Sequence, residues 1–400
     1  MNDKIDKNIK NIGVFFGSGS VEHDISIITA NLIISGLKGL AYQVTPVYIT
    51  KAGKWMLGED LGDLKVFADP NKKIEDRQEY AEYYLDMQES VGKMVFKKKG
   101  LMGKTITLDL AFPAFHGTYG EDGTMQGLFE MFGIPYVGCG VPASAIAMDK
   151  ALTKIMMRDA KVPTTKFIYF YKKDWEAGQA QIMEQAKKEL KWPVMVKPAH
   201  LGSSIGIGKA RDEKEFIQKV EVAAFYDNKV IVEEVVEDLM DVTCCLIGND
   251  EPRASELQES LYTIDLFSFE DKYLTDGGAQ TGKSTRSVVI PARLDAETTK
   301  AIKETAINVY KILECTGIAR VDFLINRTTN KFFANEVNPL PGTIYHHLWQ
   351  ASGMELPELL KNLIRFAQEK YEEKKRVNYS FESSVLKGLG GSSFKSNKLG

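Results

Sequence analysis

The chain has 400 residues, of which 44% are apolar and 26% are charged, a composition typical of a globular protein with two or three domains. It carries 54 acidic and 51 basic residues, and this near balance argues against a protein that binds nucleic acid or a membrane surface through a basic face. The start of the chain is charged and no apolar run approaches the roughly 18–20 residues that cross a bilayer, so we expect a cytoplasmic protein without a membrane partner.

The first third of the chain alternates short β-branched or aromatic runs with helical patterns. Strands are predicted at residues 12–16, 44–49, 108–112 and 135–138, and helices after residue 20 and over 123–132. Such alternation is typical of an α/β domain built on a parallel sheet. The charged span 71–103 is interpreted as a solvated excursion from this domain.

The rest of the chain contains two further units and a tail. We expect one helix over 145–160, strands at 193–197, 229–234, 242–247, 318–325 and 331–338, and a helix over 356–374. The predicted domains are 1–143, 144–235 and 236–375, followed by a flexible tail at 376–400.

Two of these strands carry oxygen-bearing side chains with a spacing that suits a metal. Glu336 and Asn338 are two positions apart and so share one face of their strand, and a hairpin would place Asp322 opposite Glu336. Two carboxylates and an amide oxygen suit Mg²⁺ better than Zn²⁺, which prefers nitrogen and sulfur. A surface salt bridge between Arg320 and the acids is the alternative interpretation.

Lys197 ends an apolar strand and precedes a glycine–serine segment that can turn backbone N–H groups toward an anion. The spacing matches no standard phosphate loop, so a plain tight turn remains the alternative. Earlier in the chain, Glu22 lies near a helix start, where it either caps the first turn or meets a substrate ammonium group.

Several short motifs follow one another in order along the chain. They are EHDIS at 22–26, FHG at 115–117 with GEDGTMQG at 120–127, PYVG at 135–138 with AMDK at 147–150, KP at 197–198 with GSS at 202–204, EDKY at 270–273, RVD at 320–322, and NEVN at 335–338 with PG at 341–342. In this order they resemble the D-alanine–D-alanine ligase family of ATP-grasp enzymes. The resemblance implies a Rossmann-like pre-ATP-grasp domain followed by a two-part ATP-grasp domain, α/β overall and α+β in the grasp.

The resemblance also implies a role for each matched residue. The ATP phosphates would be bound by Lys150, Lys197, Ser204 and Lys272. The adenine slot would be lined by Glu233, Glu234 and Val236, and Asp241 would contact the ribose. Two Mg²⁺ ions, or Mn²⁺ as a substitute, would be held by Asp322, Glu336 and Asn338. Glu22 would bind the first amino acid's ammonium group and would form hydrogen bonds with Ser203 and Tyr273. Charge on the acyl group would be stabilised by Arg320 and the Gly342 N–H, and His116 would line the acceptor pocket.

The segment after Gly342 departs from the family. The family continues with a Ser/Thr-rich stretch that binds the acceptor's carboxylate, whereas this chain has a shorter run with His346 and His347. The acceptor would then be bound either by these histidines or by Lys283 and Arg286. The two cations lie in a long loop at 274–286, which either closes as a lid or is simply a solvated loop.

The leading hypothesis is therefore an ATP-dependent ligase that joins two D-alanines through an acyl phosphate for peptidoglycan synthesis. The alternatives are a related ligase with a different acceptor, and a nucleotide-binding regulator that has lost catalysis. The predicted partners are small amino acids and a second copy of the chain in a homodimer.

Overall fold

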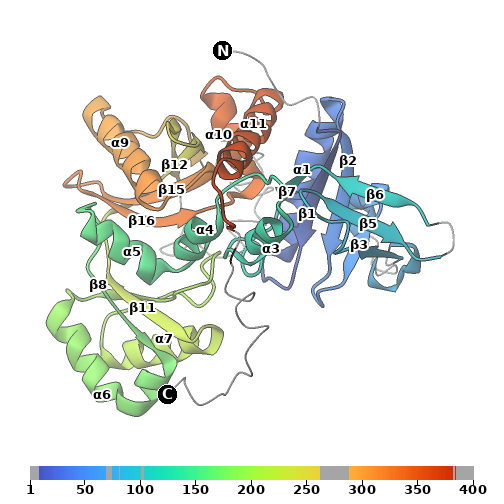
Figure 1. The fold of residues 1–400 in the computed structure, drawn as a ribbon. Coiled ribbons are helices and arrows are strands. Elements are labelled where there is room, and N and C mark those ends of the chain that lie inside the picture. The colour runs from blue at the N-terminus through green and yellow to red at the C-terminus, as the bar shows by residue number, and fades with distance from the viewer. Residues whose placement is uncertain are drawn as a thin grey trace.

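The protein is described here by a computed structural model covering residues 9–68, 74–80, 82–100, 103–261, 288–381 and 383. Within these residues the strands form four sheets, which Figure 1 shows side by side with helices packed around them. Two predicted features lie outside the described residues: the loop at 274–286 with its flanking motif at 270–273, and most of the tail.

The N-terminal unit is built on a four-stranded sheet with the order β3-β2-β1-β7. Its strands are β1 (Asn11–Gly17), β2 (Gln43–Ile49), β3 (Trp55–Leu57) and β7 (Leu110–Pro113). Its helices include α1 (His23–Gly39), α2 (Leu64–Ala68) and α3 (Thr124–Phe132). Short 3₁₀ helices form at η1 (Glu59–Gly62), η2 (Ile74–Asp76) and η3 (Gln78–Tyr80). Strand β1 pairs in parallel with β2 and β7, as the alternating pattern predicted. The run predicted as a strand at 135–138 forms only an isolated bridge from Tyr136 to Ala111.

The interpretation of residues 71–103 as a solvated excursion was wrong. A three-stranded sheet forms from β4 (Tyr83–Leu85), β5 (Met94–Lys98) and β6 (Thr105–Leu108). Met94 and Phe96 are buried in the core of the N-terminal unit, so this short apolar run outweighs the charges around it. The predicted strand at 108–112 is divided between β6 and β7 at Asp109, whose carboxylate accepts the backbone N–H groups of Lys10 and Asn11.

The central unit has an antiparallel sheet with the order β10-β9-β11-β8. Its elements are β8 (Phe167–Tyr171), α6 (Lys172–Glu189), β9 (Val194–Pro198), β10 (Gly208–Ala210), α7 (Glu213–Tyr226) and β11 (Lys229–Glu234). The glycine–serine segment connects β9 to β10, so it is a turn between strands, as expected.

The single helix predicted over 145–160 is two helices, α4 (Val141–Met148) and α5 (Lys150–Asp159). The chain is extended at Asp149, with φ −95° and ψ 102°, and the Asp149 carboxylate accepts the N–H groups of Ala151 and Leu152. Asp149 thus caps the second helix, a role for which a short acidic side chain is well suited. Lys150 becomes the first residue of α5.

The C-terminal unit has a five-stranded antiparallel sheet with the order β14-β13-β12-β15-β16. Its elements are β12 (Leu239–Gly248), β13 (Arg253–Ser260), β14 (Val288–Val289), α9 (Ala296–Ile312), β15 (Gly317–Asn326), β16 (Phe332–Asn338), η4 (Gly342–Tyr345), α10 (His346–Ala351) and α11 (Leu356–Lys375). Figure 1 shows α10 and α11 between this sheet and the N-terminal unit. Leu360 of α11 and Trp349 of α10 share a core with Ile33 and Ile34 of α1, so helices of the N-terminal and C-terminal units pack together.

The domain boundaries remain predictions. The first, at residue 143, falls inside α4, and the second follows β11. No helix among the described residues is both long and apolar enough to cross a membrane.

Candidate active site

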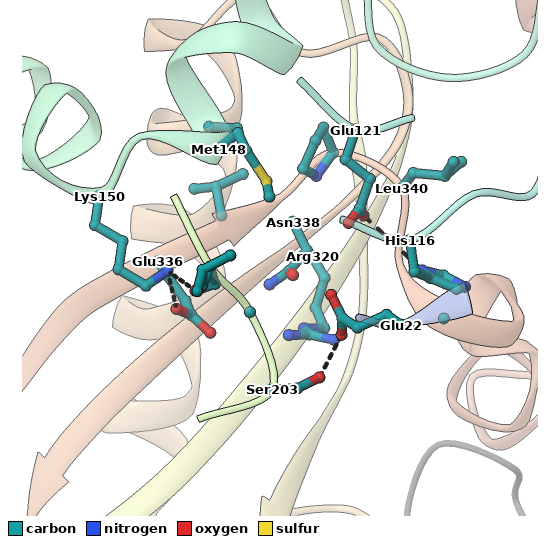
Figure 2. Close-up of a pocket in the computed structure, with 16 residues that line it drawn as sticks. Glu22, His116, Glu121, Met148, Lys150, Ser203, Arg320, Glu336, Asn338 and Leu340 are labelled. Carbon is teal, nitrogen blue, oxygen red and sulfur yellow. Dashed lines mark hydrogen bonds and ion pairs between the residues drawn. The ribbon is translucent and has the colours of Figure 1, made fainter. Parts of the chain in front are cut away.

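A pocket lies where the three units meet, and many of the predicted site residues line it. Figure 2 shows these side chains pointing toward one another from separate elements. The lining residues are Glu22, His116, Glu121, Ala147, Met148, Lys150, Leu201, Gly202, Ser203, Arg320, Glu336, Val337, Asn338, Pro339, Leu340 and Gly342.

The β15–β16 hairpin forms one wall of the pocket in the predicted register. Asp322 pairs with Glu336, and Arg320 pairs with Asn338. Arg320 Nε donates to Asp322 Oδ1 at 2.9 Å and Arg320 NH2 donates to Oδ2 at 2.6 Å, while Thr243 Oγ1 also donates to Oδ1. Arg320 and Asp322 are both buried, so the surface salt bridge considered as the alternative is instead a buried bidentate pair, which fixes the guanidinium.

The predicted metal ligands have suitable chemistry for a hard cation. Asp322 and Glu336 supply carboxylates, and the Asn338 amide nitrogen lies 3.3 Å from Asp322 Oδ2. Within the described part of the chain, no group of three or more His, Cys, Asp or Glu side chains is arranged to hold a metal ion. Both oxygens of Asp322 are engaged with Arg320, so metal binding there requires these contacts to be shared or exchanged.

Lys150 lies at the start of α5, beside the glycine–serine turn. Its Nζ donates to the Leu201 carbonyl oxygen at 2.6 Å and lies 3.8 Å from Glu336 Oε2. In the turn, Ser203 and Ser204 have φ values of 54° and 59°, and Ser203 Oγ donates to Glu22. A Cβ atom on Gly202 would lie 2.9 Å from Glu22 Oε2, so any larger residue would displace this carboxylate.

Lys197 points into a buried charge network. Its Nζ pairs with Glu233 Oε1, and Glu233 Oε2 lies 2.9 Å from Lys154 Nζ. Thr165 Oγ1 donates to the same carboxylate at 2.7 Å, and Glu233 is only 1% exposed. Both oxygens of the Glu233 carboxylate thus have ammonium partners, and its adenine-lining role remains a prediction.

The other residues predicted to bind adenosine lie away from the pocket lining. Glu234 ends β11, and its Oε1 accepts the Lys191 N–H at 2.9 Å. Val236 follows β11 and is half-buried, and Asp241 lies on β12 opposite Leu324 and Ser260. Lys272 and Tyr273 lie outside the described residues.

The N-terminal unit contributes Glu22 and His116. Thr29 Oγ1 lies 2.8 Å from His116 Nε2 and accepts the Thr343 N–H at 3.0 Å, so Thr29 connects His116 to the segment after Gly342. Burial lowers the pKa of His116 to about 4, which makes the ring neutral at physiological pH.

Sequence reasoning gave Glu121 no role, although it lies in one of the matched motifs. Its Oε2 accepts the Gly117 N–H at 2.6 Å, and its Oε1 lies 4.0 Å from His116 Nδ1. Burial, reinforced by the nearby Glu22 carboxylate, raises the pKa of Glu121 well above its usual value. Lys154 was missed too, and its position one helical turn after Lys150 is the signal that could have found it.

The segment after Gly342 is folded against Arg320. Thr343, Ile344 and Tyr345 have φ values of 49°, 48° and 47°, a run of three left-handed residues. The Arg320 guanidinium lies over the Tyr345 ring, 5.0 Å from its centroid, and Arg320 NH1 lies 3.4 Å from the Tyr345 hydroxyl. Tyr345 in this turn therefore contacts the guanidinium through its ring and at NH1, whereas Asp322 binds Nε and NH2.

His346 and His347 do not line the pocket. His347 Nε2 lies 2.7 Å from Gln258 Oε1, and His346 Nδ1 lies 3.3 Å from the Thr343 carbonyl oxygen. Burial lowers the pKa of both rings, that of His347 to about 4. Neutral imidazoles do not suit the predicted role of binding the acceptor's carboxylate as imidazolium.

The chain is similar to D-alanine–D-alanine ligases along most of its length. Family models described as D-ala D-ala ligase N-terminus and C-terminus match residues 11–139 and 156–365. D-alanine–D-alanine ligases of Thermosipho melanesiensis and Caldicellulosiruptor bescii are each 38% identical to it, and the matches cover 94% and 93% of this chain and 98% of each relative.

The chain is also similar in fold to solved structures of such ligases. The D-alanine–D-alanine ligase of Coxiella burnetii superposes with a TM-score of 0.74 at 28% identity, covering 92% of this chain and 97% of the other. The VanG D-Ala:D-Ser ligase of Enterococcus faecalis superposes with a TM-score of 0.75 at 30% identity, covering 90% and 99%.

Proposed function

The chain belongs to the D-alanine–D-alanine ligase family, and on that premise we propose that the pocket between its three units is the active site. The predicted family and the predicted ATP-grasp fold are confirmed. The protein is an ATP-dependent ligase that joins two D-alanines by a peptide bond, and the family implies a role in peptidoglycan synthesis. The observation that carries the assignment is the convergence of Glu22, Lys150, Arg320 and Glu336 on one pocket.

The reaction requires cationic and N–H groups because two steps build negative charge. The first D-alanine's carboxylate takes the γ-phosphoryl group of ATP, which gives an acyl phosphate and ADP, and the second D-alanine's amine then attacks the acyl carbon and displaces phosphate. Arg320, fixed by Asp322 and Tyr345, would stabilise the tetrahedral oxyanion together with the Gly342 N–H.

Lys150 and Lys197 are the proposed ligands of the ATP phosphates, with Ser204 in the adjoining turn and Lys272. Lys150 Nζ contacts a carbonyl oxygen and a carboxylate, contacts that a phosphate oxygen can replace. For Glu233 we propose holding Lys197 and Lys154 in place, since both of its oxygens bind them. Glu234, Val236 and Asp241 remain the predicted adenosine contacts.

Mg²⁺ is the proposed metal, with Mn²⁺ as a substitute. The hard oxygen donors of Asp322, Glu336 and Asn338 fit either ion, and Glu336 Oε2 lies 3.8 Å from Lys150 Nζ. When bound, two such ions would neutralise charge on the phosphate oxygens.

Glu22 is the proposed ligand of the first D-alanine's ammonium group. It is buried in the pocket and held by the Ser203 hydroxyl, so its carboxylate is oriented before substrate binds. Tyr273 is predicted to complete this set, and His116 to line the acceptor side.

A related ligase activity with a different acceptor is the second candidate. The observation in its favour is the segment 343–349, where half-buried, neutral histidines replace the hydroxyl-rich stretch of the family. The VanG relative is named as a D-Ala:D-Ser ligase, so a change of acceptor has a precedent among similar structures.

Phosphate release from ATP, measured with single and paired amino acids in D and L forms and followed by mass analysis of the product, tests these proposals. D-alanyl-D-alanine as the main product supports the leading one, and another dipeptide or depsipeptide would support the second. Binding of ADP without phosphate release in any combination would indicate the regulator that has lost catalysis.

The homodimer and the cytoplasmic location remain predictions. Light scattering of the purified protein tests the first, and fractionation of the source cells tests the second.

A further inference from the structure

His200 is the centre of a charged cluster that the assigned site residues do not include. Its Nε2 lies 3.2 Å from Asp149 Oδ2, and its Nδ1 lies 3.0 Å from both carboxylate oxygens of Asp227. Lys229 Nζ donates to the same Asp149 oxygen at 2.6 Å and lies over the Tyr169 ring. The cluster thus alternates acids and bases in the order Asp227, His200, Asp149 and Lys229. It connects the start of α5, the turn after β9 and the start of β11.

This cluster joins the two segments that would bind the ATP phosphates. Asp149 immediately precedes Lys150, and His200 immediately precedes Leu201, whose carbonyl oxygen accepts Lys150 Nζ. The Lys150 N–H donates to the Ala199 carbonyl oxygen at 3.0 Å, and the His200 N–H donates to Asp227 Oδ2 at 2.7 Å. Two members of the cluster, Asp149 and His200, are therefore the chain neighbours of Lys150 and Leu201, whose side chain and carbonyl oxygen form this contact.

The bridge depends on the charge of the imidazole ring. A neutral imidazole has one N–H and can donate to only one of the two carboxylates, whereas imidazolium can donate to both. Hydrogen bonds to Asp149 and Asp227 raise the pKa of His200 to about 9, against the opposing effect of burial. The charged groups that face the ring are Asp149, which caps α5, and Asp227 between α7 and β11, while Lys229 of β11 binds Asp149.

We propose that His200 is a positioning residue for the ATP phosphate site, because its imidazolium bridges Asp149 and Asp227 and so holds the turn at 201–204 against Lys150. This inference rests on the proposed function, since it takes Lys150 and the turn to be parts of the ATP site. The side chain of His200 is 45% exposed, so water and protons reach it and the bridge follows the pH of the solution. Loss of the proton above pH 9 releases one end of the bridge.

The test compares His200→Gln, which removes the charge, with His200→Arg, which keeps it at every pH. Initial rates of phosphate release are measured with D-alanine saturating and ATP varied, from pH 7 to pH 10. At pH 7.5 we expect His200→Gln to raise the KM for ATP about 10- to 100-fold, the scale of loss when a phosphate-binding group is misplaced, with a smaller change in kcat. The ratio of variant to wild-type KM should fall toward one by pH 10, because the wild type loses its own bridge, and His200→Arg should keep a low KM throughout.

Taking the ratio cancels the titration of the substrate amine, which is common to both proteins. Asp212→Asn is the matched control, since Asp212 caps the other end of α7 and does not contact the cluster, and it should leave the KM for ATP unchanged. A wild-type KM for His200→Gln at pH 7.5, or a ratio that stays constant up to pH 10, would overturn the inference. A purely structural role would lower kcat and thermal stability equally at all pH values, and His200→Arg would not restore the KM.

Calorimetric titration with ADP separates this inference from the proposed function. If the wild type binds ADP but forms no dipeptide, the function is wrong, and the ADP affinity of His200→Gln at pH 7.5 and pH 10 still decides the role of His200. If the wild type binds no ADP, the positioning role fails together with the ATP site.

Discussion

Replacing Glu233 by glutamine should destabilise the protein more than replacing Lys154 by methionine, although both changes affect one buried network. The Glu233 carboxylate lies between the ammonium groups of Lys154 and Lys197. Glu233→Gln leaves two buried ammonium groups without the carboxylate between them. Lys154→Met leaves one carboxylate paired with one ammonium group, so the remaining charges balance.

The magnitudes follow from these two outcomes. Removing one partner of a buried ion pair and leaving the other uncompensated costs about 3–5 kcal/mol, and we expect Glu233→Gln to fall in this range. Lys154→Met loses the ion pair with Glu233 and the hydrogen bonds to Thr164 and Thr165, but it also removes the cost of burying the Lys154 ammonium group and leaves a balanced pair. We therefore expect a smaller cost, about 2 kcal/mol.

The effect of Glu233→Gln should also depend on pH. Burial alone would raise the pKa of Glu233, but the ammonium groups of Lys154 and Lys197 outweigh it and hold that pKa below its usual range. A carboxyl group with a lowered pKa in the folded state stabilises the protein above its unfolded pKa of about 4.3, and this stabilisation is lost as the pH falls toward the folded value. The difference between wild type and variant should therefore shrink below about pH 4.

Urea denaturation followed by circular dichroism measures these free energies of unfolding. Glu234→Gln is the matched control: the neighbouring carboxylate is half-buried and accepts a backbone N–H of Lys191, so its loss should cost about 1 kcal/mol or less. An equal or greater cost for Lys154→Met than for Glu233→Gln would refute the charge argument.

Three further predictions concern the catalytic site. Glu336→Ala should abolish phosphate release with little change in unfolding, because the cation loses an anionic oxygen; near-normal release at ordinary Mg²⁺ would remove Glu336 from the metal site. Glu22→Gln should raise the KM of the first D-alanine about 10- to 150-fold, because it loses a charge-assisted hydrogen bond of about 1.5–3 kcal/mol. An unchanged KM would return Glu22 to a helix-start role. Since burial lowers the pKa values of His346 and His347, the KM of the acceptor should not follow a histidine titration between pH 6 and 8, and a rise in KM across this range that His347→Ala removes would contradict the neutral rings.

The site residues of the β15–β16 hairpin are the part of the site that the sequence predicted best. The two-residue spacing of Glu336 and Asn338, with Asp322 on the preceding strand, was enough to place these groups together, and the structure has Asp322 opposite Glu336. Directly after Asp322 the register shifts by one residue, so that Phe323 pairs with Ala334, and the spacing in the sequence did not predict this irregularity.

Prediction failed where contacts distant in sequence override a local pattern. The helical periodicity continues across residue 149, yet the chain breaks there because Asp149 caps α5 and pairs with Lys229 of β11. The signal in the sequence was Asp149 itself, an acid suited to an N-cap. Glu121 lies in a matched motif, but nothing in the local pattern indicated its role, which follows from the Gly117 N–H and the position of His116.

The turn at Thr343–Tyr345 shows most clearly how the site shapes the chain. Each left-handed residue that is not glycine costs about 1–2 kcal/mol, so no local rule would predict three in succession. Burial of Ile344 and Tyr345 in a shared core, together with the hydrogen bond from Thr343 to Thr29, offsets this cost. The turn also brings Tyr345 over Arg320, so the segment that replaces the family's hydroxyl-rich stretch supports the guanidinium instead of presenting a cation to the acceptor.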